Sequence, residues 1–412
     1  MTQTTSPVNP ATASAAGSSE PVPASPSSPG GAPEVTIIVP TINEAENLPP
    51  LMERIAAAMS GTDYEVLIVD DNSRDETPTV CARLSASYPL TLLVRKEPAN
   101  GLSGAVLYGM ARARGQYFAV MDADLQHPPE RLCALLEPLK RGDADFVIGS
   151  RYTAGGSTEG EWGLFRKLNS KVATLLARPF AGRTTDPMSG FFALRRDTYS
   201  SARQLTPLGY KIALELMCKS RAKQVREIPI HFATRQRGQS KLTIQQQFRY
   251  LEHLSRLYDF TFPRASPIAK FLIATAAGWL AGLGVYLAAL PAGPVAAPVI
   301  AYPATTLVTA LFHLRYVHTQ REFLIRPKPW LDFAVISLAE WAACFLAAVW
   351  VAHRVRVPGW WETFVLTFGV ATLTRYVLRK EFMQDIRGLR REIRREELAE
   401  AAVDKTKMED RG

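Results

Sequence analysis

The sequence predicts an α/β domain followed by a bundle of four membrane-spanning helices. Between about residues 34 and 261, short apolar runs rich in β-branched residues alternate with stretches of helical spacing, a pattern typical of βαβ units. From about residue 267 the chain carries four segments almost free of charge, each near the roughly 20 residues that cross a bilayer. The formal net charge of +9 suits an anionic partner such as a membrane surface or a phosphorylated ligand.

Residues 1–33 consist mainly of Pro, Ala, Ser, Thr and Gly, with Glu20 as their one charge. They contain neither a basic segment nor an apolar run, which excludes a signal peptide. Too few apolar residues are present to offset the entropy of ordering, so we expect a disordered tail. The four cysteines are scattered without a C-x-x-C pair, which argues against a zinc site or a disulfide framework.

Four runs in the α/β half read as buried parallel strands, because they are continuously apolar rather than alternating. We expect these strands over 35–40, 64–71, 90–96 and 116–124. We expect helices over 44–59, 77–89 and 101–114. Strands that alternate with helices in this way imply a parallel sheet.

The four apolar segments of the second half lie at 268–290, about 295–313, 331–351 and 359–374. The loop after the first segment has no basic residue, whereas the loop after the second and the tail after the fourth are rich in arginine. Basic residues stay on the cytoplasmic side, so we expect both ends, and the α/β half, to be cytoplasmic. Residues 243–262 have amphipathic helical spacing, which fits a helix on the membrane surface or one packed on the α/β domain.

Two strand ends of the predicted sheet are acidic. Asp70 and Asp71 follow one buried strand, and Asp122 and Asp124 follow another. Ligands of open α/β sheets bind beyond these carboxyl ends, and clustered carboxylates need a cation to neutralise them. The pattern therefore indicates a Mg²⁺ or Mn²⁺ site that grips a diphosphate, with a solvated turn as the alternative. Neither G-x-G-x-x-G nor a P-loop motif is present, so a Rossmann or P-loop nucleotide site is not expected.

Seven motifs occur in order between about residues 35 and 242: "VPTINEAENL", "VDDNSRDET", "MDADLQHPPE", "GSRY", "DPMSGFFAL", "PLGYKIALEL" and "RQRGQSKL". Together they closely resemble the family-2 glycosyltransferases, specifically dolichol-phosphate mannose synthases and bacterial polyprenol-phosphate relatives. The membrane half looks like a four-helix GtrA-type domain, on its topology and on "RYVLRKEF".

The resemblance implies a GT-A fold that binds a nucleotide-sugar donor through a divalent metal. The implied donor-binding residues are Pro40, Ile42, Glu44, Val69, Asp71, Asp122, Ala123, Asp124, Gln126, Lys211, Arg235 and Lys241. Asp122, Asp124 and Gln126 are the implied ligands of Mg²⁺ or Mn²⁺. Asp124 and Arg235 are the implied catalytic residues. A lipid phosphate is expected at Arg151, Arg166 and Ser170.

The resemblance also implies the reaction, which is transfer of a hexose to a polyprenyl phosphate of the dolichyl type at the cytoplasmic membrane face. GDP-mannose is the favoured donor. A phosphate monoester has its second pKa near ~6 and is already anionic at pH 7. We therefore expect direct displacement with inversion and no dedicated general base, and we interpret His127 as a turn residue.

The expected domains are a tail (1–33), a transferase domain (34–242), an interfacial linker (243–266), a transmembrane domain (267–380) and a basic cytoplasmic tail (381–412). Alternative functions are a UDP-glucose-dependent glucosyltransferase and a flippase or transport component for lipid-linked sugar. A processive polysaccharide synthase is a further alternative, because residues 246–250 nearly match Q-x-x-R-W, with Tyr250 in place of Trp. No nucleic-acid recognition motif is present, and the oligomeric state is not encoded in any readable pattern.

Overall fold

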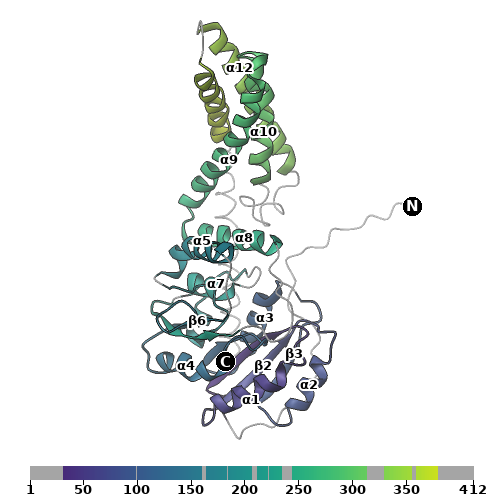
Figure 1. Cartoon of the computed structure of the whole chain (residues 1–412), viewed down its shortest axis with the longest axis vertical. Helices are drawn as coiled ribbons and strands as arrows, with labels where there is room; N and C mark the ends of the chain where they lie inside the picture. The colour runs from purple at the N-terminus through teal and green to yellow at the C-terminus, as the bar shows by residue number, and fades with distance from the viewer. Residues whose placement is uncertain are drawn as a thin grey trace, which may run out of the picture. The chain divides into compact units, whose positions relative to one another are not determined.

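A computed structural model of the chain describes residues 31–98, 100–159, 164–182, 184–206, 211–220, 222–233, 244–312, 329–354 and 359–378 (Figure 1). The chain divides into two compact units, Met1–Leu257 and Tyr258–Gly412. Most of the expected N-terminal tail and all of the expected basic tail at 381–412 lie outside the described residues.

Within the described part of the first unit, seven strands form one sheet in the order β3-β2-β1-β4-β7-β5-β8. Their bounds are β1 Val35–Thr41, β2 Tyr64–Asp70, β3 Leu90–Val94, β4 Tyr117–Val120, β5 Phe146–Ser150, β7 Phe192–Arg195 and β8 Val225–Pro229. Two short strands, β6 (Ser157–Thr158) and β9 (His231–Phe232), pair in parallel beside it. The four strands expected from the sequence are β1 to β4, each within four residues of its expected bounds.

The expectation of a parallel sheet is wrong at one strand. β7 runs antiparallel to both β4 and β5, so the sheet is mixed. A short apolar run such as Phe192–Arg195 shows that a strand is buried but carries no signal of its direction. That direction depends on the path of the chain through the turn before β7, which only the folded structure gives.

Helices cover the sheet because their apolar residues fall on one face. The bounds of four of them are α1 Leu48–Ala58, α2 Thr77–Leu84, α3 Gly101–Met110 and α4 Leu132–Lys140. In α1, Leu48, Leu51, Met52 and Ile55 are buried at helical spacing. The helix begins at Leu48 rather than at residue 44, since a pair of prolines fits only in a first turn. Residues 44–47 are thereby left as a turn beyond the end of β1.

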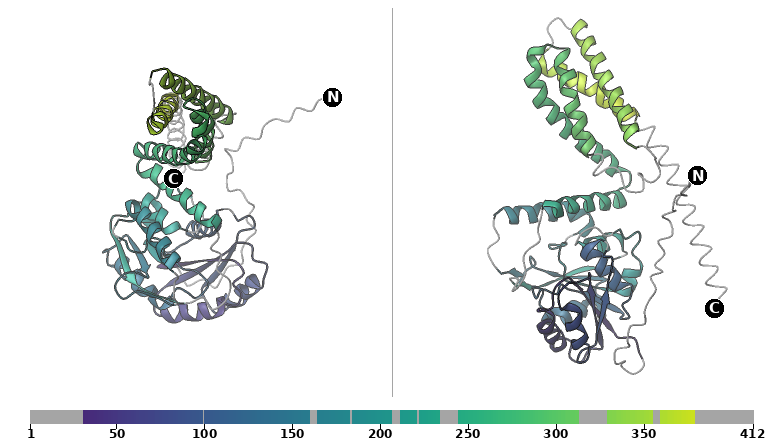
Figure 2. Two further views of the ribbon diagram at one scale, coloured as in Figure 1. Left: turned by 45° about the horizontal axis from the view of Figure 1, so that its top comes forward. Right: turned by 90° about the vertical axis from the view of Figure 1, so that its right-hand side faces the viewer.

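In the first unit, α5 (Leu164–Ala181) lies beside the part of α8 (Ile244–Thr261) that precedes Tyr258 (Figure 2). The Tyr250 hydroxyl on α8 donates to the Ala173 carbonyl on α5 at 2.8 Å. Each helix also exposes apolar side chains: Val172 and Leu175 on α5, Phe248 and Leu251 on α8. One face of α8 therefore packs on the domain, as the second alternative expected. The exposed Phe248 and Leu251 leave contact with the membrane surface a prediction.

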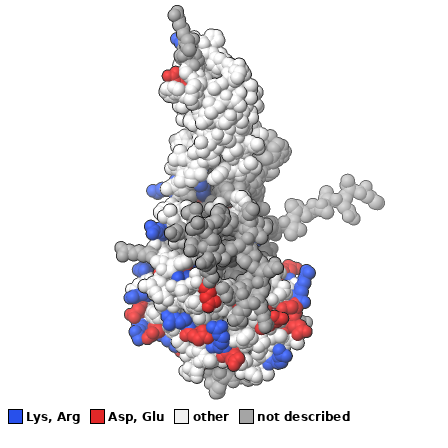
Figure 3. Space-filling view, viewed as in Figure 1, with Lys and Arg blue, Asp and Glu red and all other residues white. Residues whose placement is uncertain are grey.

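On the face shown in Figure 3, the described helices of the second unit carry few charged side chains, whereas the first unit carries many. Its helices are α9 (Ala265–Ala289), α10 (Ala296–Phe312), α12 (Pro329–Arg354) and a helix over 360–378. Among the described residues, Ala265–Ala292 and Ala334–Arg354 are long and apolar enough to span a membrane. All four segments expected from the sequence are thus helical, and two of them are long and apolar enough to span a membrane.

An ion pair is buried inside this helical unit. Arg375 donates through Nε and Nη2 to the two carboxylate oxygens of Glu340, at 2.8 and 2.7 Å, and both side chains are almost completely buried. The Tyr302 hydroxyl lies 3.1 Å from Glu340 Oε2 and 3.1 Å from Arg375 Nη2. Three helices, α10, α12 and 360–378, are therefore joined by one polar cluster. Intramembrane charges persist only when paired in this way.

Removing one member of this pair is predicted to destabilise the protein strongly. Glu340→Leu leaves the Arg375 guanidinium buried without its carboxylate, a loss of about 3–5 kcal/mol. The double variant Glu340→Leu/Arg375→Leu should recover most of that stability. Thermal unfolding of the detergent-solubilised protein measures both, with Arg354→Leu at the exposed end of α12 as the control. Equal unfolding temperatures for Glu340→Leu and the control would contradict the prediction.

Candidate active site

The carboxyl ends of β1, β2 and β4 meet at one edge of the sheet, because these three strands are parallel neighbours. The two aspartates that end β2 have different roles there. Asp70 is buried, and its carboxylate accepts hydrogen bonds from the backbone N–H and the hydroxyl of Ser73, which closes the turn. Asp71 is turned toward Arg95, whose Nε lies 3.1 Å from Asp71 Oδ1. Burial and the neighbouring Asp70 raise the pKa of Asp71, while Arg95 opposes that shift.

Beyond β4 the chain turns through the D-x-D motif. Asp124 is 5% exposed, and its Oδ1 accepts the Gln126 N–H at 3.2 Å. The Asp122 carboxylate is more open, with 32% of its side chain exposed. Gln126 is bound to Ala233 through its side-chain amide and its backbone carbonyl, at 3.0 and 3.1 Å. The motif is therefore held on one side by the segment that follows β9.

His127 supports this turn from behind. Its Nδ1 accepts the Asp122 N–H at 3.1 Å, which places the proton of the neutral ring on Nε2. The ring stacks on Phe191 with centroids 5.3 Å apart and is buried. These contacts agree with its interpretation as a turn residue.

The "DPMSGFF" motif, to which the sequence assigns no role, lies against the D-x-D motif. A Cβ placed on Gly190 would be 3.2 Å from Asp122 Oδ2 and 3.2 Å from His127 Cε1. A side chain here would press on the Asp122 carboxylate, which would have to shift by a few tenths of an ångström. Ser189 fixes the same turn by donating to the Gly149 carbonyl at 2.7 Å.

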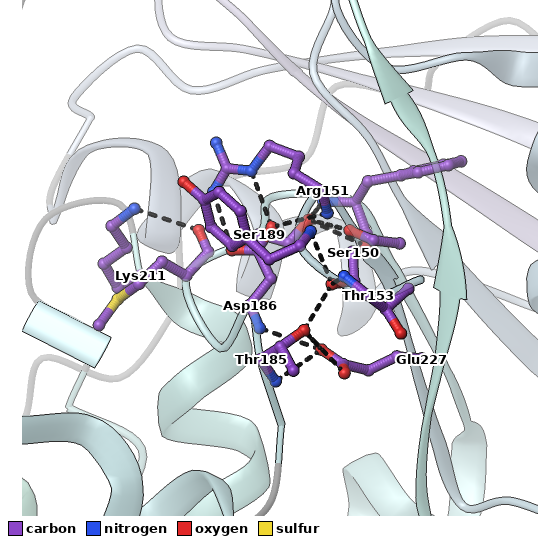
Figure 4. A network of polar contacts seen from close by, with 12 residues as sticks. Ser150, Arg151, Thr153, Thr185, Asp186, Ser189, Lys211 and Glu227 are labelled. Carbon is purple, nitrogen blue, oxygen red and sulfur yellow. Dashed lines mark hydrogen bonds and ion pairs between the residues drawn. The ribbon is translucent and has the colours of Figure 1, made fainter. Parts of the chain in front are cut away.

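Asp186, at the start of that motif, forms a bidentate pair with Arg151 (Figure 4). Arg151 donates through Nε and Nη2 to the two oxygens of Asp186, at 2.7 and 2.8 Å, and through its backbone N–H at 3.1 Å. Burial opposes the charge on Arg151, but Asp186 holds the pKa of Arg151 above its ordinary value. From the other side, Glu227 on β8 accepts the backbone N–H groups of Thr185 and Asp186 at 2.9 and 3.0 Å.

Lys211 approaches the same turn from the N-terminus of α7 (Ile212–Lys219), where its Nζ donates to the Met188 carbonyl at 3.1 Å (Figure 4). Burial of the ammonium group and the nearby charge of Arg151 lower the pKa of Lys211 to about 7. Asp186 and Asp122 oppose this shift. The charges of Arg151, Asp186 and Asp122 therefore all act on Lys211. Asp124 adds a further carboxylate two residues after Asp122.

The acidic groups fit a divalent cation. No cluster of three or more His, Cys, Asp or Glu side chains suited to a metal occurs among the described residues. Asp122 and Asp124 alone present carboxylates at this turn, which suits Mg²⁺ or Mn²⁺. These hard cations bind through one or two carboxylates and take their remaining ligands from water and substrate phosphates. A site for a structural metal would need more protein ligands.

The residues expected to contact the nucleotide flank this turn on the β1 and β2 side. Pro40 and Val69 are Cα partners in the β1–β2 register, and the Val69 side chain is buried against Gly109. Any contact from Val69 is thus left to its backbone. Ile42 is 44% exposed in the turn after β1.

Glu44 lies in a pocket of about 380 Å³ between the turns that follow β1 and β2. The lining residues are Asn43, Glu44, Ala45, Glu46, Asn47, Asp75 and Glu76. Carboxylates accept hydrogen bonds from hydroxyl and amino groups, so the pocket suits a sugar hydroxyl or a base better than a phosphate.

Some expected site residues cannot be placed. Arg235 and Lys241 lie outside the described residues. The backbone of Arg166 and Ser170 lies in helix α5, and their side chains lie outside the described part of the structure. The sequence predicts a fixed turn near the site at Asp186 and Gly190, which the structure confirms, but it gives no indication of Glu227 or Arg95. An aspartate and a glycine within "DPMSG" signal a fixed turn, but Glu227 and Arg95 have no local signal.

A mixed sheet with a D-x-D turn, an arginine and a lysine at its carboxyl edge suits the class of transferase that acts on a diphosphate-bearing donor. The family pattern described as Glycosyl transferase family 2 matches residues 36–201, and that described as GtrA/DPMS, transmembrane domain, matches residues 270–383.

Three relatives, each named dolichol-phosphate mannosyltransferase, align with more than half of this chain. The protein of Pyrococcus furiosus is 42% identical over 254 residues, 61% of this chain and 71% of the relative. That of Mycosarcoma maydis is 41% identical over 58% of this chain and 84% of the relative. That of Saccharomyces cerevisiae is 39% identical over 56% of this chain and 88% of the relative.

These similarities show that the chain belongs to the dolichol-phosphate mannosyltransferase family of the family 2 glycosyltransferases. A glucosyl-3-phosphoglycerate synthase from Mycobacterium tuberculosis covers 55% of this chain at 18% identity, with a TM-score of 0.43.

Gly190→Ala is predicted to weaken metal binding, because the added Cβ would displace the Asp122 carboxylate. We expect a roughly tenfold loss of Mn²⁺ affinity in the presence of GDP. Isothermal titration of Mn²⁺ into the full-length protein measures it. Gly284→Ala is the control, since a Cβ there meets nothing within 4 Å. Unchanged Mn²⁺ affinity in Gly190→Ala would show that this contact does not shape the metal site.

Proposed function

We propose that this protein transfers mannose from GDP-mannose to a polyprenyl phosphate of the dolichyl type, with inversion and with a divalent metal. The observation that carries the proposal is the convergence of the D-x-D turn, the Arg151–Asp186 pair and Lys211 on one edge of the sheet. The membership of the chain in the dolichol-phosphate mannosyltransferase family supports it.

In the proposed mechanism, Asp122 and Asp124, with Gln126, hold Mg²⁺ or Mn²⁺ at the donor diphosphate. The bound cation supplies electrostatic stabilisation of the departing nucleoside diphosphate. Lys211 adds a positive charge near the same diphosphate, and we assign Arg235 and Lys241 to it as well. Pro40, Ile42, Glu44, Val69, Asp71 and Ala123 are proposed to hold the nucleotide and sugar. The turn formed by residues 186–191 positions Asp122 through its close packing at Gly190.

The acceptor phosphate is proposed to bind at Arg151, Arg166 and Ser170. Two of the Arg151 donors are already engaged by Asp186, so its contribution is a fixed positive charge rather than a free bidentate fork. Because Asp186 already holds the Arg151 side chain in one conformation, phosphate binding does not have to order that side chain. The phosphate is anionic at neutral pH, so attack on the sugar needs no general base from the chain.

We place the enzyme in the cell membrane as a multi-pass protein with four spans and a cytoplasmic active site. The match to a GtrA/DPMS transmembrane domain supports the membrane location. The spacing of basic residues supports the orientation. Exposed apolar side chains on α5 and α8, including Leu175 and Phe248, are suited to contact with lipid at the surface where a polyprenyl phosphate presents its headgroup. We retain 34–242, 243–266 and 267–380 as the transferase, linker and membrane domains.

GDP-mannose is the proposed donor and UDP-glucose the alternative. The first is favoured because all three relatives are named as mannosyltransferases. A flippase or transport role for the chain as a whole is less well supported, because the polar network at the sheet edge is intact.

Transfer of radiolabel to polyprenyl phosphate tests the proposal directly. The full-length protein in membranes is offered GDP-mannose or UDP-glucose, each with Mg²⁺, Mn²⁺ or EDTA. We expect metal-dependent label in lipid from GDP-mannose, reduced at least about 100-fold in Asp124→Asn. Asp63→Asn, an exposed aspartate before β2, is the matched control. Label from UDP-glucose alone would overturn the donor, and no lipid product from either donor would overturn the function.

The pH dependence of donor use should report on Lys211. Its pKa of about 7 leaves Nζ mostly charged at pH 6 and mostly neutral at pH 8. The ratio kcat/KM for GDP-mannose, which reports groups of the free enzyme, should therefore fall roughly fivefold between pH 7 and pH 8. Lys211→Arg stays charged and should remove the decline. Lys140→Arg, an ion-paired surface lysine, should keep it. Identical profiles for wild type and Lys211→Arg would contradict the assignment.

A further inference from the structure

The short helix α7 carries a second ionised group one turn beyond Lys211. Lys211 stands at the N-terminus of α7 and donates to the 186–191 turn. Glu215 lies four residues later and is 0% exposed. It takes no part in the polar network at the sheet edge. A buried carboxylate is retained only where its partners satisfy it.

Two segments donate hydrogen bonds to Glu215, and a third brings a longer electrostatic contact. Its Oε1 accepts the Lys219 ammonium and the Thr206 N–H, each at 2.7 Å. Its Oε2 lies 3.4 Å from Nε2 of His253, which is on α8 and 1% exposed. Burial alone would raise the pKa of Glu215, but His253, Lys219 and Thr206 hold it at about 2. The carboxylate is therefore ionised at every pH at which an enzyme of this kind works.

Lys219 extends the cluster back along the chain. Its Nζ also donates to the Gln204 carbonyl at 2.7 Å and to the Thr206 hydroxyl at 3.0 Å. Glu215 and Lys219 together thus tie the segment before Lys211 to the helix after it. A helix of two turns moves as one body, so the position of the Glu215 carboxylate fixes that of the Lys211 backbone.

The third partner connects this cluster to the apolar surface of α8. His253 lies on the buried face of α8 with Tyr250, Leu254 and Leu257, while Phe248 and Leu251 are exposed on the other side. A rotation or shift of α8 would move His253 away from Glu215. Loss of that contact would leave a buried carboxylate with less compensation.

We propose that Glu215 is a positioning residue for the donor site. Through α7, Glu215 holds Lys211 in place. Through His253, it couples the position of Lys211 to the packing of α8 on the domain. The inference rests on the proposed function, because it takes Lys211 to act on the donor diphosphate. The inference adds a functional residue outside the donor site. It also gives a route by which contact between α8 and lipid would change the position of Lys211 in the donor site.

A double-mutant cycle separates positioning from general stability. Kd for GDP with Mg²⁺ is measured by isothermal titration on the full-length protein in nanodiscs for wild type, Glu215→Gln, Lys211→Met and the double variant. We expect Glu215→Gln to weaken GDP binding roughly tenfold in the wild-type background and less than about twofold in Lys211→Met, as for coupled residues. Equal effects in both backgrounds would overturn the inference.

Glu65→Gln is the matched control. Glu65 is also a buried carboxylate, and it accepts from the Thr36 hydroxyl at 2.7 Å and from the Arg114 backbone and guanidinium at 2.7 and 2.8 Å. It lies at the amino end of the sheet, opposite the site. We expect a comparable fall in unfolding temperature and an unchanged Kd for GDP. Weakened binding in Glu65→Gln would show that the loss in Glu215→Gln is only instability.

The variant His253→Leu tests the link to α8, and it also serves if Glu215→Gln fails to fold. It should weaken GDP binding in the same direction, again only when Lys211 is present. A wild-type Kd in His253→Leu would overturn the link. If Lys211→Met itself leaves GDP binding unchanged, the donor role assigned to Lys211 under the proposed function has failed. If Lys211→Met weakens binding and Glu215→Gln does not, only the present inference has failed.

Discussion

The ion pair between Arg151 and Asp186 is the contact on which the candidate site depends. It joins the end of β5 to the turn before β7 through three hydrogen bonds. That turn brings Gly190 against the Asp122 carboxylate and the Met188 carbonyl to Lys211. Since both partners are largely removed from water, breaking the pair would leave an uncompensated charge beside the D-x-D turn. The reversed direction of β7 is part of the same arrangement.

Buried charge pairs organise both units of the protein. In the first unit, Asp186 accepts hydrogen bonds from the guanidinium and the backbone N–H of Arg151. Glu215 accepts hydrogen bonds from the Lys219 ammonium and the Thr206 backbone N–H. In the second unit, Glu340 and Arg375, with the Tyr302 hydroxyl, join three helices that also pack through a cluster of buried apolar side chains. Burial makes each pair expensive to break, and directional hydrogen bonds make each one specific to a single packing arrangement. Apolar contacts alone would stabilise these helices without fixing their positions so closely.

Local sequence patterns identified the elements whose signals are continuous along the chain. The first four strands, the first three helices and the four apolar segments follow from hydrophobic runs and their spacing. The acidic ends of β2 and β4 followed too, because a carboxylate directly after a buried strand is unusual. The residues missed were those whose partners are distant, such as Glu227, which is 41 positions from Asp186. No window of sequence contains both members of such a contact.

The sequence alone determined the class of the protein, since motif order, apolar length and charge spacing are properties of the chain itself. It also set the chemistry, because the types of side chain in the D-x-D and "RGQSKL" motifs restrict what they can bind. Only the tertiary structure decided that Asp70 caps a turn while Asp71 faces Arg95, and that β7 runs antiparallel. It also decided that His253 meets Glu215. These outcomes depend on which segments pack together, and packing is set by the whole chain rather than by neighbours in sequence.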